Sequence, residues 1–280
     1  EIESLCEIAN PNIGIITNIG KAHLEGFGSE EGIIKTKSEL YNYLETTNGK
    51  AFVNINNPLL IKLSKSLNRI FYGNDPEADI KGKIMEVNPF LKLSWAYKDF
   101  QSKSNMDYSL NSKLIGRYNF ENILAAISVG HYFNIEPILI KKAIEEYTPD
   151  NNRSQIIRRN NKLIILDSYN ANPTNMEAAI MNFKNMPGKN KVAIIGDMLE
   201  LGNYSEQEHL KIYELLQEQN FTSLIFVGPR FFKICEKEKH QCFESSESAY
   251  SWLKDHSLPD SVILIKASRG MKLEKLADVL

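Results

Sequence analysis

The sequence has few cysteines, no long apolar run and no excess of charge of one sign, and each absence excludes a class of protein. Its three cysteines, Cys6, Cys235 and Cys242, are spaced like neither a zinc site nor a disulfide framework. We therefore expect reduced thiols in a cytoplasmic protein. The longest apolar runs, such as 262–265, are far shorter than the ~20 residues that cross a bilayer, and no signal peptide is visible, so we expect no membrane insertion. A net charge of −2 indicates no basic surface for nucleic acid.

Short apolar segments instead alternate with longer amphipathic ones. With 42% hydrophobic and 24% charged residues, the 280-residue chain is ordinary for a globular protein of two domains. Apolar runs and period-two segments predict strands at 13–19, 51–54, 69–72, 80–87, 91–97, 106–110, 163–166, 192–195, 224–227 and 262–265. Segments of helical period predict helices at 29–44, 58–67, 119–133, 137–147, 175–184, 205–217, 247–254 and 271–279.

This alternation predicts an α/β fold with largely parallel sheets, and the strands between 80 and 110 predict an antiparallel section. The turn formers at 148–152 predict a domain boundary, which gives domains 1–149 and 150–280. In parallel α/β sheets, ligands bind at the carboxyl ends of the strands. The residues that follow each predicted strand are therefore the candidates for ligand contacts.

A polar segment at 17–29 follows the first predicted strand and contains His23. A surface loop with a histidine that binds nothing is the plain alternative to a ligand site. Ser29 is placed to cap the next helix, although no capping box is completed. Lys35 and Lys37 follow on that helix, and since they are two residues apart, at most one of them faces the loop. Two solvated lysines are the alternative.

Four further polar segments follow predicted strands or begin predicted helices. Asn119 and Asn122 share a face at a helix start, where their amides can bind an adenine edge or where Asn119 can simply cap the helix. Asp167 ends a strand, where a carboxylate can accept from ribose hydroxyls or form an Asx-turn. Two acids lie between glycines at 196–202. A lysine, a serine and an arginine lie at 266–269, at the start of the last predicted helix, where they favour a phosphate or a carboxylate.

These segments, taken in order, resemble the Mur ligase family. The matching strings are TNIGKAHLEGFGS, EGIIKTKSEL, GRYNFENILAA, DSYNANPTNMEAA, GDMLELG and KASRGMKLE, which span the chain. DSYNANP and GDMLELG favour the branch that adds D-alanyl-D-alanine. The resemblance implies the second half of a central ATPase domain followed by a Rossmann-like C-terminal domain. It also implies a preceding domain and a glycine-rich phosphate loop, so we expect the 280-residue chain alone to be inactive.

The resemblance assigns roles to individual residues. It implies that His23 and a carbamylated Lys37 hold Mg²⁺, and that Asn119 and Asn122 bind the adenine, although the family usually has histidine where Tyr118 stands. On the C-terminal domain it implies that Arg153 contacts the ATP phosphates and Asp167 the ribose. The catalytic residues are then Lys37, His23 and Arg153. The residues expected to face the peptide substrates are Tyr169, Asn170, Lys266, Ser268 and Arg269.

The implied activity is ATP-dependent amide-bond formation in peptidoglycan precursor synthesis, by a monomer. Its substrates would be ATP, D-alanyl-D-alanine and UDP-N-acetylmuramoyl-tripeptide, with Mg²⁺ as cofactor. Alternatives are a ligase that adds the third residue, a folylpolyglutamate synthase, and a nucleotide-binding module without catalysis. A dinucleotide-dependent dehydrogenase is disfavoured, because no Gly-x-Gly-x-x-Gly follows a predicted strand.

Overall fold

A computed structural model of the chain describes residues 1–21, 24–98, 105–235 and 240–280. It divides into two compact units, each with its own sheet and core. Unit 1 comprises residues 1–20 and 29–147, and unit 2 comprises residues 21–28 and 148–280. Among the described residues, none of the helices combines the length and the apolar character needed to cross a membrane.

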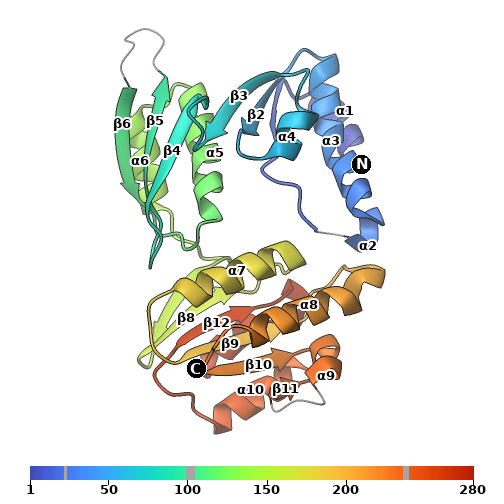
Figure 1. The fold of residues 1–280 in the computed structure, drawn as a ribbon, viewed down its shortest axis with the longest axis vertical. Helices are drawn as coiled ribbons and strands as arrows, with labels where there is room; N and C mark the ends of the chain where they lie inside the picture. The colour runs from blue at the N-terminus through green and yellow to red at the C-terminus, as the bar shows by residue number, and fades with distance from the viewer. Residues whose placement is uncertain (22–23, 99–104, 236–239) are drawn as a thin grey trace. The chain divides into compact units, whose positions relative to one another are not determined.

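Unit 1 is built on a six-stranded mixed sheet with the strands in chain order (Figure 1). The first four strands pair in parallel and the last three pair antiparallel, as the sequence predicts for 80–110. The strands are β1 (Ile13–Ile15), β2 (Lys50–Asn54), β3 (Asn68–Gly73), β4 (Ile80–Glu86), β5 (Lys92–Lys98) and β6 (Asn105–Asn111). The helices are α1 (Ile2–Ala9), α3 (Glu30–Thr46), α4 (Pro58–Leu63), α5 (Asn119–Tyr132) and α6 (Pro137–Glu146).

Two apolar cores stabilise unit 1, because its sheet buries side chains on both faces. Helix α5 packs its apolar residues, such as Leu124, against Phe52 and Trp95 of the sheet. Helix α3 buries Tyr41 and Leu44 in a second cluster with residues of β2. Helix α3 begins where the sequence predicts, since the Ser29 hydroxyl accepts from the Gly32 N–H at 3.1 Å.

Unit 2 is a six-stranded sheet in the order β11-β10-β9-β12-β8-β7, parallel except for the edge strand β7. Its strands are β7 (Gln155–Arg159), β8 (Lys162–Asp167), β9 (Lys191–Gly196), β10 (Ser223–Val227), β11 (Gln241–Phe243) and β12 (Val262–Lys266). Its helices are α2 (Leu24–Phe27), α7 (Pro173–Asn185), α8 (Ser205–Gln217), α9 (Pro229–Cys235) and α10 (Ser246–Asp255), with 3₁₀ turns η1 (Gly202–Tyr204), η2 (Arg269–Met271) and η3 (Leu273–Asp278). The interior residues of the central strands are apolar, and the charged residues of these strands stand at their ends, because helical elements cover the faces of the sheet.

Several sequence predictions differ from the structure. The first strand ends at Ile15 instead of residue 19. The hairpin strand β7 was not predicted, and neither were the helices α1, α2 and α9 or the edge strand β11. The last segment forms 3₁₀ turns instead of an α-helix, because Lys272 adopts a left-handed conformation with φ of 53° and interrupts the helix.

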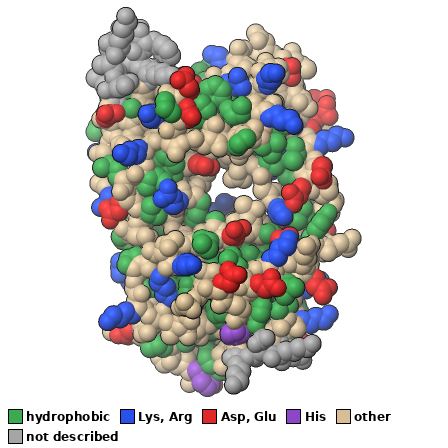
Figure 2. Space-filling view, in the orientation of Figure 1, with side chains coloured by type: hydrophobic (Ala, Val, Ile, Leu, Met, Phe, Trp, Pro, Cys, Tyr) green, Lys and Arg blue, Asp and Glu red, His purple; other side chains and the backbone are tan. Residues whose placement is uncertain are grey.

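The surface carries charge of both signs. On the face drawn in Figure 2, acidic and basic side chains are interspersed, in keeping with a net charge of −2. On this face, attraction of a charged ligand must therefore come from local groups of charges.

Candidate functional site

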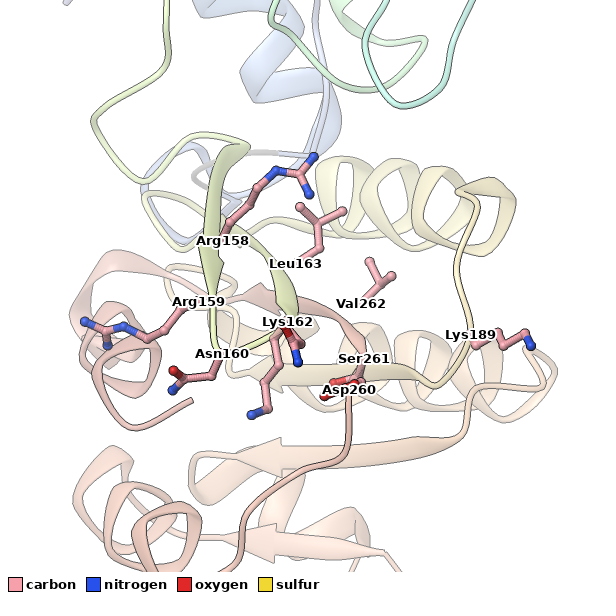
Figure 3. A pocket seen from close by; sticks show the side chains of 10 residues that line it. Arg158, Arg159, Asn160, Lys162, Leu163, Lys189, Asp260, Ser261 and Val262 are labelled. Atoms are coloured by element: carbon pink, nitrogen blue, oxygen red, sulfur yellow. The ribbon is translucent and has the colours of Figure 1, made fainter.

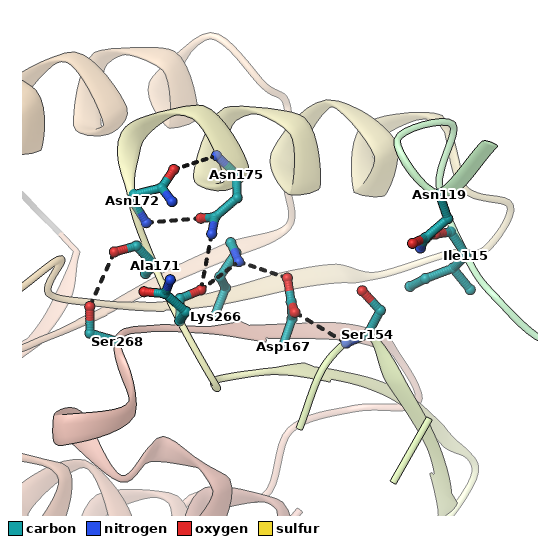
Figure 4. Close-up of polar contacts among 10 residues, drawn as sticks. Ile115, Asn119, Ser154, Asp167, Ala171, Asn172, Asn175, Lys266 and Ser268 are labelled. Carbon is teal, nitrogen blue, oxygen red and sulfur yellow. Dashed lines mark hydrogen bonds and ion pairs between the residues drawn. The ribbon is translucent and has the colours of Figure 1, made fainter. Parts of the chain in front are cut away.

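The carboxyl ends of β8 and β12 bring an acid and a base together in unit 2. The parallel register places Asp167 beside Lys266, and the Lys266 ammonium donates to the Asp167 carboxylate at 2.7 Å (Figure 4). Lys266 is only 1% exposed and also donates to the Asn170 carbonyl at 3.3 Å. The other Asp167 oxygen accepts from the Ser154 N–H at 3.1 Å. Both carboxylate oxygens are thus engaged, although each has a lone pair left for a ligand hydroxyl.

We expect Asp167→Asn to lower the free energy of unfolding of the chain by about 3 kcal/mol, because it leaves the Lys266 ammonium buried without a counter-charge. The measurement is urea unfolding followed by circular dichroism. Lys266→Met is the informative companion, since it removes the cation itself and leaves the partly exposed Asp167 able to reach water. A smaller loss for Asp167→Asn than for Lys266→Met would contradict this account of the pair.

Tyr169 lies beside two guanidinium groups. The guanidinium carbon of Arg153 is 3.9 Å from the centre of the Tyr169 ring, and that of Arg269 is 5.2 Å away. A hydrogen bond from Arg153 and the positive charges of both arginines lower the pKa of the Tyr169 phenol. The stacked ring fixes the Arg153 side chain, which is exposed at the start of unit 2.

Ser268 ties three strand-end loops together. It is 5% exposed, and its hydroxyl donates to the Ala171 carbonyl at 3.2 Å and accepts from the Leu199 N–H at 2.9 Å. These loops follow β8, β9 and β12, so the motifs DSYNANP, GDMLELG and KASRG meet at one edge of the sheet. The sequence predicts that Ser268 and Arg269 lie at the start of a helix, but the structure has the short 3₁₀ turn η2 there. No α-helix dipole therefore favours an anion at this point.

The loop after β8 leads into α7 through a capping box. Asn172 accepts from the Asn175 N–H at 3.0 Å, and the Asn175 amide accepts from the Asn172 N–H at 2.9 Å (Figure 4). An Asx-turn at Asp167 was the alternative to ribose binding for this segment. An Asx residue does cap the helix, but that residue is Asn172 and not Asp167. The cap fixes the path of residues 168–172 and leaves Tyr169 half-buried and Asn170 exposed.

A buried histidine that the sequence analysis did not single out supports the loop after β9. His209 of α8 is fully buried, its Nδ1 donates to the Ser205 carbonyl at 2.6 Å, and its Nε2 accepts from the Met198 N–H at 3.0 Å. Burial lowers the pKa of His209, and the contact with Met198 requires this neutral ring. The sequence did indicate this burial, because Ile212 and Tyr213, three and four residues after His209, place it on the apolar face of the helix.

We expect His209→Ala to lower the free energy of unfolding by about 3 kcal/mol, through the cavity and the two backbone groups left unpaired. Since the pKa of folded His209 lies below its unfolded value of about 6.5, the contribution of the ring is complete above that pH and is lost below it. The difference between the two proteins in urea unfolding should therefore shrink from pH 7.5 to pH 5.5. The exposed His256, changed to Ala, is the control and should cost well under about 1 kcal/mol. A difference that grows toward pH 5.5 would refute a neutral His209.

In unit 1, one of the two candidate lysines faces the loop after β1, as predicted. The Lys37 ammonium donates to the Asn18 carbonyl at 3.0 Å, whereas Lys35 is exposed. Burial lowers the pKa of Lys37, so a larger fraction of its amine is neutral. His23 lies outside the described residues, and among those described no three His, Cys, Asp or Glu side chains gather as a metal site.

The two candidate adenine residues meet at the start of α5. The Asn119 amide donates to the Ile115 carbonyl at 2.8 Å (Figure 4). The Asn122 amide donates to the Asn119 side chain at 3.1 Å. Tyr118 occupies the cap position, so Asn119 does not cap the helix. Gly116 has a φ of +84°, and a side chain there would meet the Tyr118 ring. The glycine thus lets the chain turn tightly before the asparagines.

Comparisons with known proteins match both parts of the chain to one protein family. The Mur ligase middle domain matches residues 1–130, and the glutamate ligase domain of Mur ligases matches residues 152–269. The UDP-N-acetylmuramoyl-tripeptide–D-alanyl-D-alanine ligase of Bacillus subtilis is 29% identical over 99% of this chain and 60% of that protein. A crystal structure of MurF from Acinetobacter baumannii, 27% identical, superposes with a TM-score of 0.84 over 100% of this chain and 62% of that one.

A folylpolyglutamate synthase structure from Thermotoga maritima shares the fold at lower similarity. It is 13% identical, with a TM-score of 0.65 over 95% of this chain and 60% of that one. The chain therefore spans about 60% of the length of the relatives that it matches.

Proposed function

Because the chain belongs to the Mur ligase family, we propose that the protein is an ATP-dependent amide-bond ligase of peptidoglycan precursor synthesis. It would join D-alanyl-D-alanine to UDP-N-acetylmuramoyl-tripeptide as a cytoplasmic monomer. The observation that carries this proposal is the meeting of the three motif loops around Ser268, beside the Lys266–Asp167 ion pair and the Arg153–Tyr169 stack. The proposed domains are 1–149, the second half of the central ATP-binding domain, and 150–280, the C-terminal domain.

In the central domain, we assign nucleotide and metal binding to the residues near β1 and α5. Asn119 and Asn122 would bind adenine, with amide groups already aligned at the helix start. The half-buried amine of Lys37, with its lowered pKa, suits carbamylation, because only a neutral amine attacks CO₂. The carbamate would supply an oxygen ligand for Mg²⁺, with His23 as a nitrogen ligand. When bound, Mg²⁺ supplies positive charge that offsets repulsion between the ATP phosphates and an attacking carboxylate.

In the C-terminal domain, some of the candidate residues would touch ligands and others would position them. Arg153 would contact the ATP phosphates, and Asp167 the ribose. Tyr169, Asn170 and Arg269 reach the surface and would face the peptide substrates. Lys266 and Ser268 are more than nine-tenths buried, so we propose that they act mainly by holding Asp167 and the strand-end loops.

The reaction would proceed in two steps. The terminal carboxylate of the tripeptide attacks the γ-phosphorus of ATP, ADP leaves, and an acyl phosphate forms. The amine of D-alanyl-D-alanine then attacks the acyl carbon, phosphate leaves, and the amine loses a proton to give the amide. The tripeptide carboxylate and the ATP phosphates, which are both negative, approach each other in the first step. The positive charge of Arg153 would therefore lower the barrier to that step.

The test is phosphate release by the full-length protein with each candidate pair of substrates. We expect release that requires both UDP-N-acetylmuramoyl-tripeptide and D-alanyl-D-alanine. Release with the UDP-linked dipeptide and a diamino acid would indicate the ligase that adds the third residue. Release with a folate and glutamate would indicate a folylpolyglutamate synthase. Nucleotide binding without release under any of these conditions would indicate a non-catalytic module.

A further inference from the structure

Charged side chains line a hollow of about 590 Å³ at the amino-terminal edge of the unit 2 sheet, but they do not converge on one point. Arg158 and Arg159 are neighbours on β7, and successive side chains of a strand point to opposite faces of the sheet. Figure 3 shows these two guanidinium groups directed away from each other, with the Lys189 ammonium directed away from both. A small anion cannot contact the three cations together, so we assign no ligand to this hollow.

Two of the three cysteines, in contrast, come together on one face of the same sheet. Cys242 is the middle residue of β11 and pairs with Phe226 of β10, so their side chains point to the same face. The centre of the Phe226 ring lies 5.3 Å from that of Phe231 on α9, and α9 also packs on β11. Phe243, the next residue of β11, lies on the other face against Trp252 of α10. Cys242 therefore faces α9.

Cys235 reaches the same place from the helix. It follows Phe231 by four residues on α9, so the two side chains share a face, and they are the two buried residues of this helix. A hydrogen bond joins the thiols of Cys235 and Cys242. The Cys242 thiol also donates to the His240 carbonyl at 3.6 Å. The two sulfur atoms are therefore in contact, although residues 236–241 separate them in the sequence.

The two thiols differ in their access to solvent. Cys235 is 1% exposed, whereas Cys242 is partly exposed. Burial raises the pKa of the Cys242 thiol, and the hydrogen bond from Cys235 opposes this effect. Because the thiolate is the reactive form, a mostly protonated Cys242 keeps the pair reduced when no oxidant is present. A small solute can reach the Cys242 sulfur, and Cys235 is in place to react with the product.

We propose that Cys235 and Cys242 form a site of reversible oxidation, at which hydrogen peroxide converts the two thiols into a disulfide. The Cys242 thiolate attacks one peroxide oxygen, the O–O bond breaks, and the hydroxide that leaves takes up the thiol proton, which gives a sulfenic acid and water. The Cys235 sulfur then attacks the Cys242 sulfur, and the second water leaves with the Cys235 proton. Two thiols and one peroxide thus give one disulfide and two waters, with sulfur oxidised and the peroxide oxygens reduced.

The disulfide fixes the end of α9 to β11, and the start of α9 supports a loop of the candidate functional site. The N–H groups of Arg230 and Phe231 donate to the Asp197 carboxylate at 2.9 and 3.0 Å. Asp197 belongs to the GDMLELG motif that follows β9. Oxidation therefore constrains the helix that holds this loop, without changing a residue that is proposed to contact a ligand.

Peptide mapping of the native full-length protein by mass spectrometry tests the proposal. Trypsin separates Cys235, in peptide 234–237, from Cys242, in peptide 240–254, because it cleaves after lysine. After peroxide treatment and alkylation of the remaining thiols, we expect the two peptides to be joined, at the sum of their masses less two hydrogen atoms. Dithiothreitol should return both as separate peptides. The treatment is about tenfold longer than free cysteine needs, to allow for the raised pKa of Cys242.

Three variants separate the roles of the cysteines. Cys6→Ser is the matched control, because Cys6 is the only cysteine of unit 1, and it should leave the joined peptide unchanged. Cys235→Ser should stop the reaction at the Cys242 sulfenic acid, which dimedone traps. Cys242→Ser should leave the buried Cys235 unmodified.

The wild-type measurement needs no variant, so the proposal stays falsifiable if a substitution at the buried Cys235 unfolds the chain. Two thiols that both remain free for alkylation after peroxide, or a Cys242 sulfinic acid without the joined peptide, would overturn the proposal. None of these outcomes depends on ligase activity, so they leave the proposed function untouched.

Discussion

Arg153→Ala in the full-length protein is expected to lower turnover roughly 10²-fold or more while changing ATP affinity little. Arg153 belongs to unit 2, whereas the proposed adenine contacts, Asn119 and Asn122, belong to unit 1. An arginine that reaches the phosphates only when the domains close over substrate stabilises the transition state more than the ground state. The measurements are the steady-state rate at saturating substrates and ATP binding in the absence of the other substrates.

Arg230→Ala is the matched control, because Arg230 is also exposed on unit 2 and its side chain has no proposed role. Its turnover should stay within about twofold of the wild type. If instead ATP affinity collapses in Arg153→Ala while turnover at saturating ATP survives, Arg153 is a ground-state binder, and the predicted domain boundary at 148–152 does not act as a hinge for closure over the substrates.

The contact between the Arg153 guanidinium and the Tyr169 ring allows a test of how Arg153 is held in position. Tyr169→Phe keeps the aromatic ring 3.9 Å from the guanidinium, so we expect it to retain most of the turnover. Tyr169→Leu removes the ring and should lose turnover, with little change in the KM for ATP. Equal losses in both variants would show that the phenol hydroxyl, and not the ring, is what matters.

The central strands of unit 2 could be predicted from the sequence because they are buried on both faces. The predicted strand 192–195 corresponds to β9 (Lys191–Gly196), since an apolar run of that length between turn formers has few other stable conformations. The hairpin strand β7 was missed because an edge strand is half-exposed, and Arg158 and Arg159 interrupt its apolar pattern. The turn residues Asn160 and Asn161 were the available signal.

The sequence predicts where along the chain the candidate site residues lie, but not which of them contact one another. The sequence places Asp167 and Lys266 at strand ends, but their ion pair joins residues 99 positions apart and depends on β8 and β12 being neighbours in the sheet. The interruption at Lys272 has no local signal, because a lysine with positive φ is set by its tertiary surroundings. Burial is likewise a property of the fold, and it separates Lys266 and Ser268 from Arg269, which the sequence grouped together.

Lys37→Ala in the full-length protein is expected to abolish measurable ligation, a loss of roughly 10²–10³-fold or more. Lys37 is the lysine of this helix that is half-buried and faces the loop after β1, at 3.0 Å from the Asn18 carbonyl. If its carbamate provides an oxygen ligand for Mg²⁺, the alanine variant loses an anionic ligand of that ion. Acetate or another small carboxylate should then restore part of the activity, because it can occupy the space left by the carbamate.

Lys35→Ala is the control, because Lys35 is two residues away on the same helix but exposed, and its activity should match the wild type. A readout independent of catalysis is the carbamate itself: ¹³C-labelled CO₂ should give one protein-bound carbamate resonance that Lys37→Ala removes and Lys35→Ala keeps. The lowered pKa of Lys37 sets the direction of its pH dependence, since a larger neutral fraction of the amine allows carbamylation at lower pH than for an exposed lysine. An inactive Lys35→Ala beside an active Lys37→Ala, or a resonance that persists in Lys37→Ala, would move the modified residue to another face of the helix.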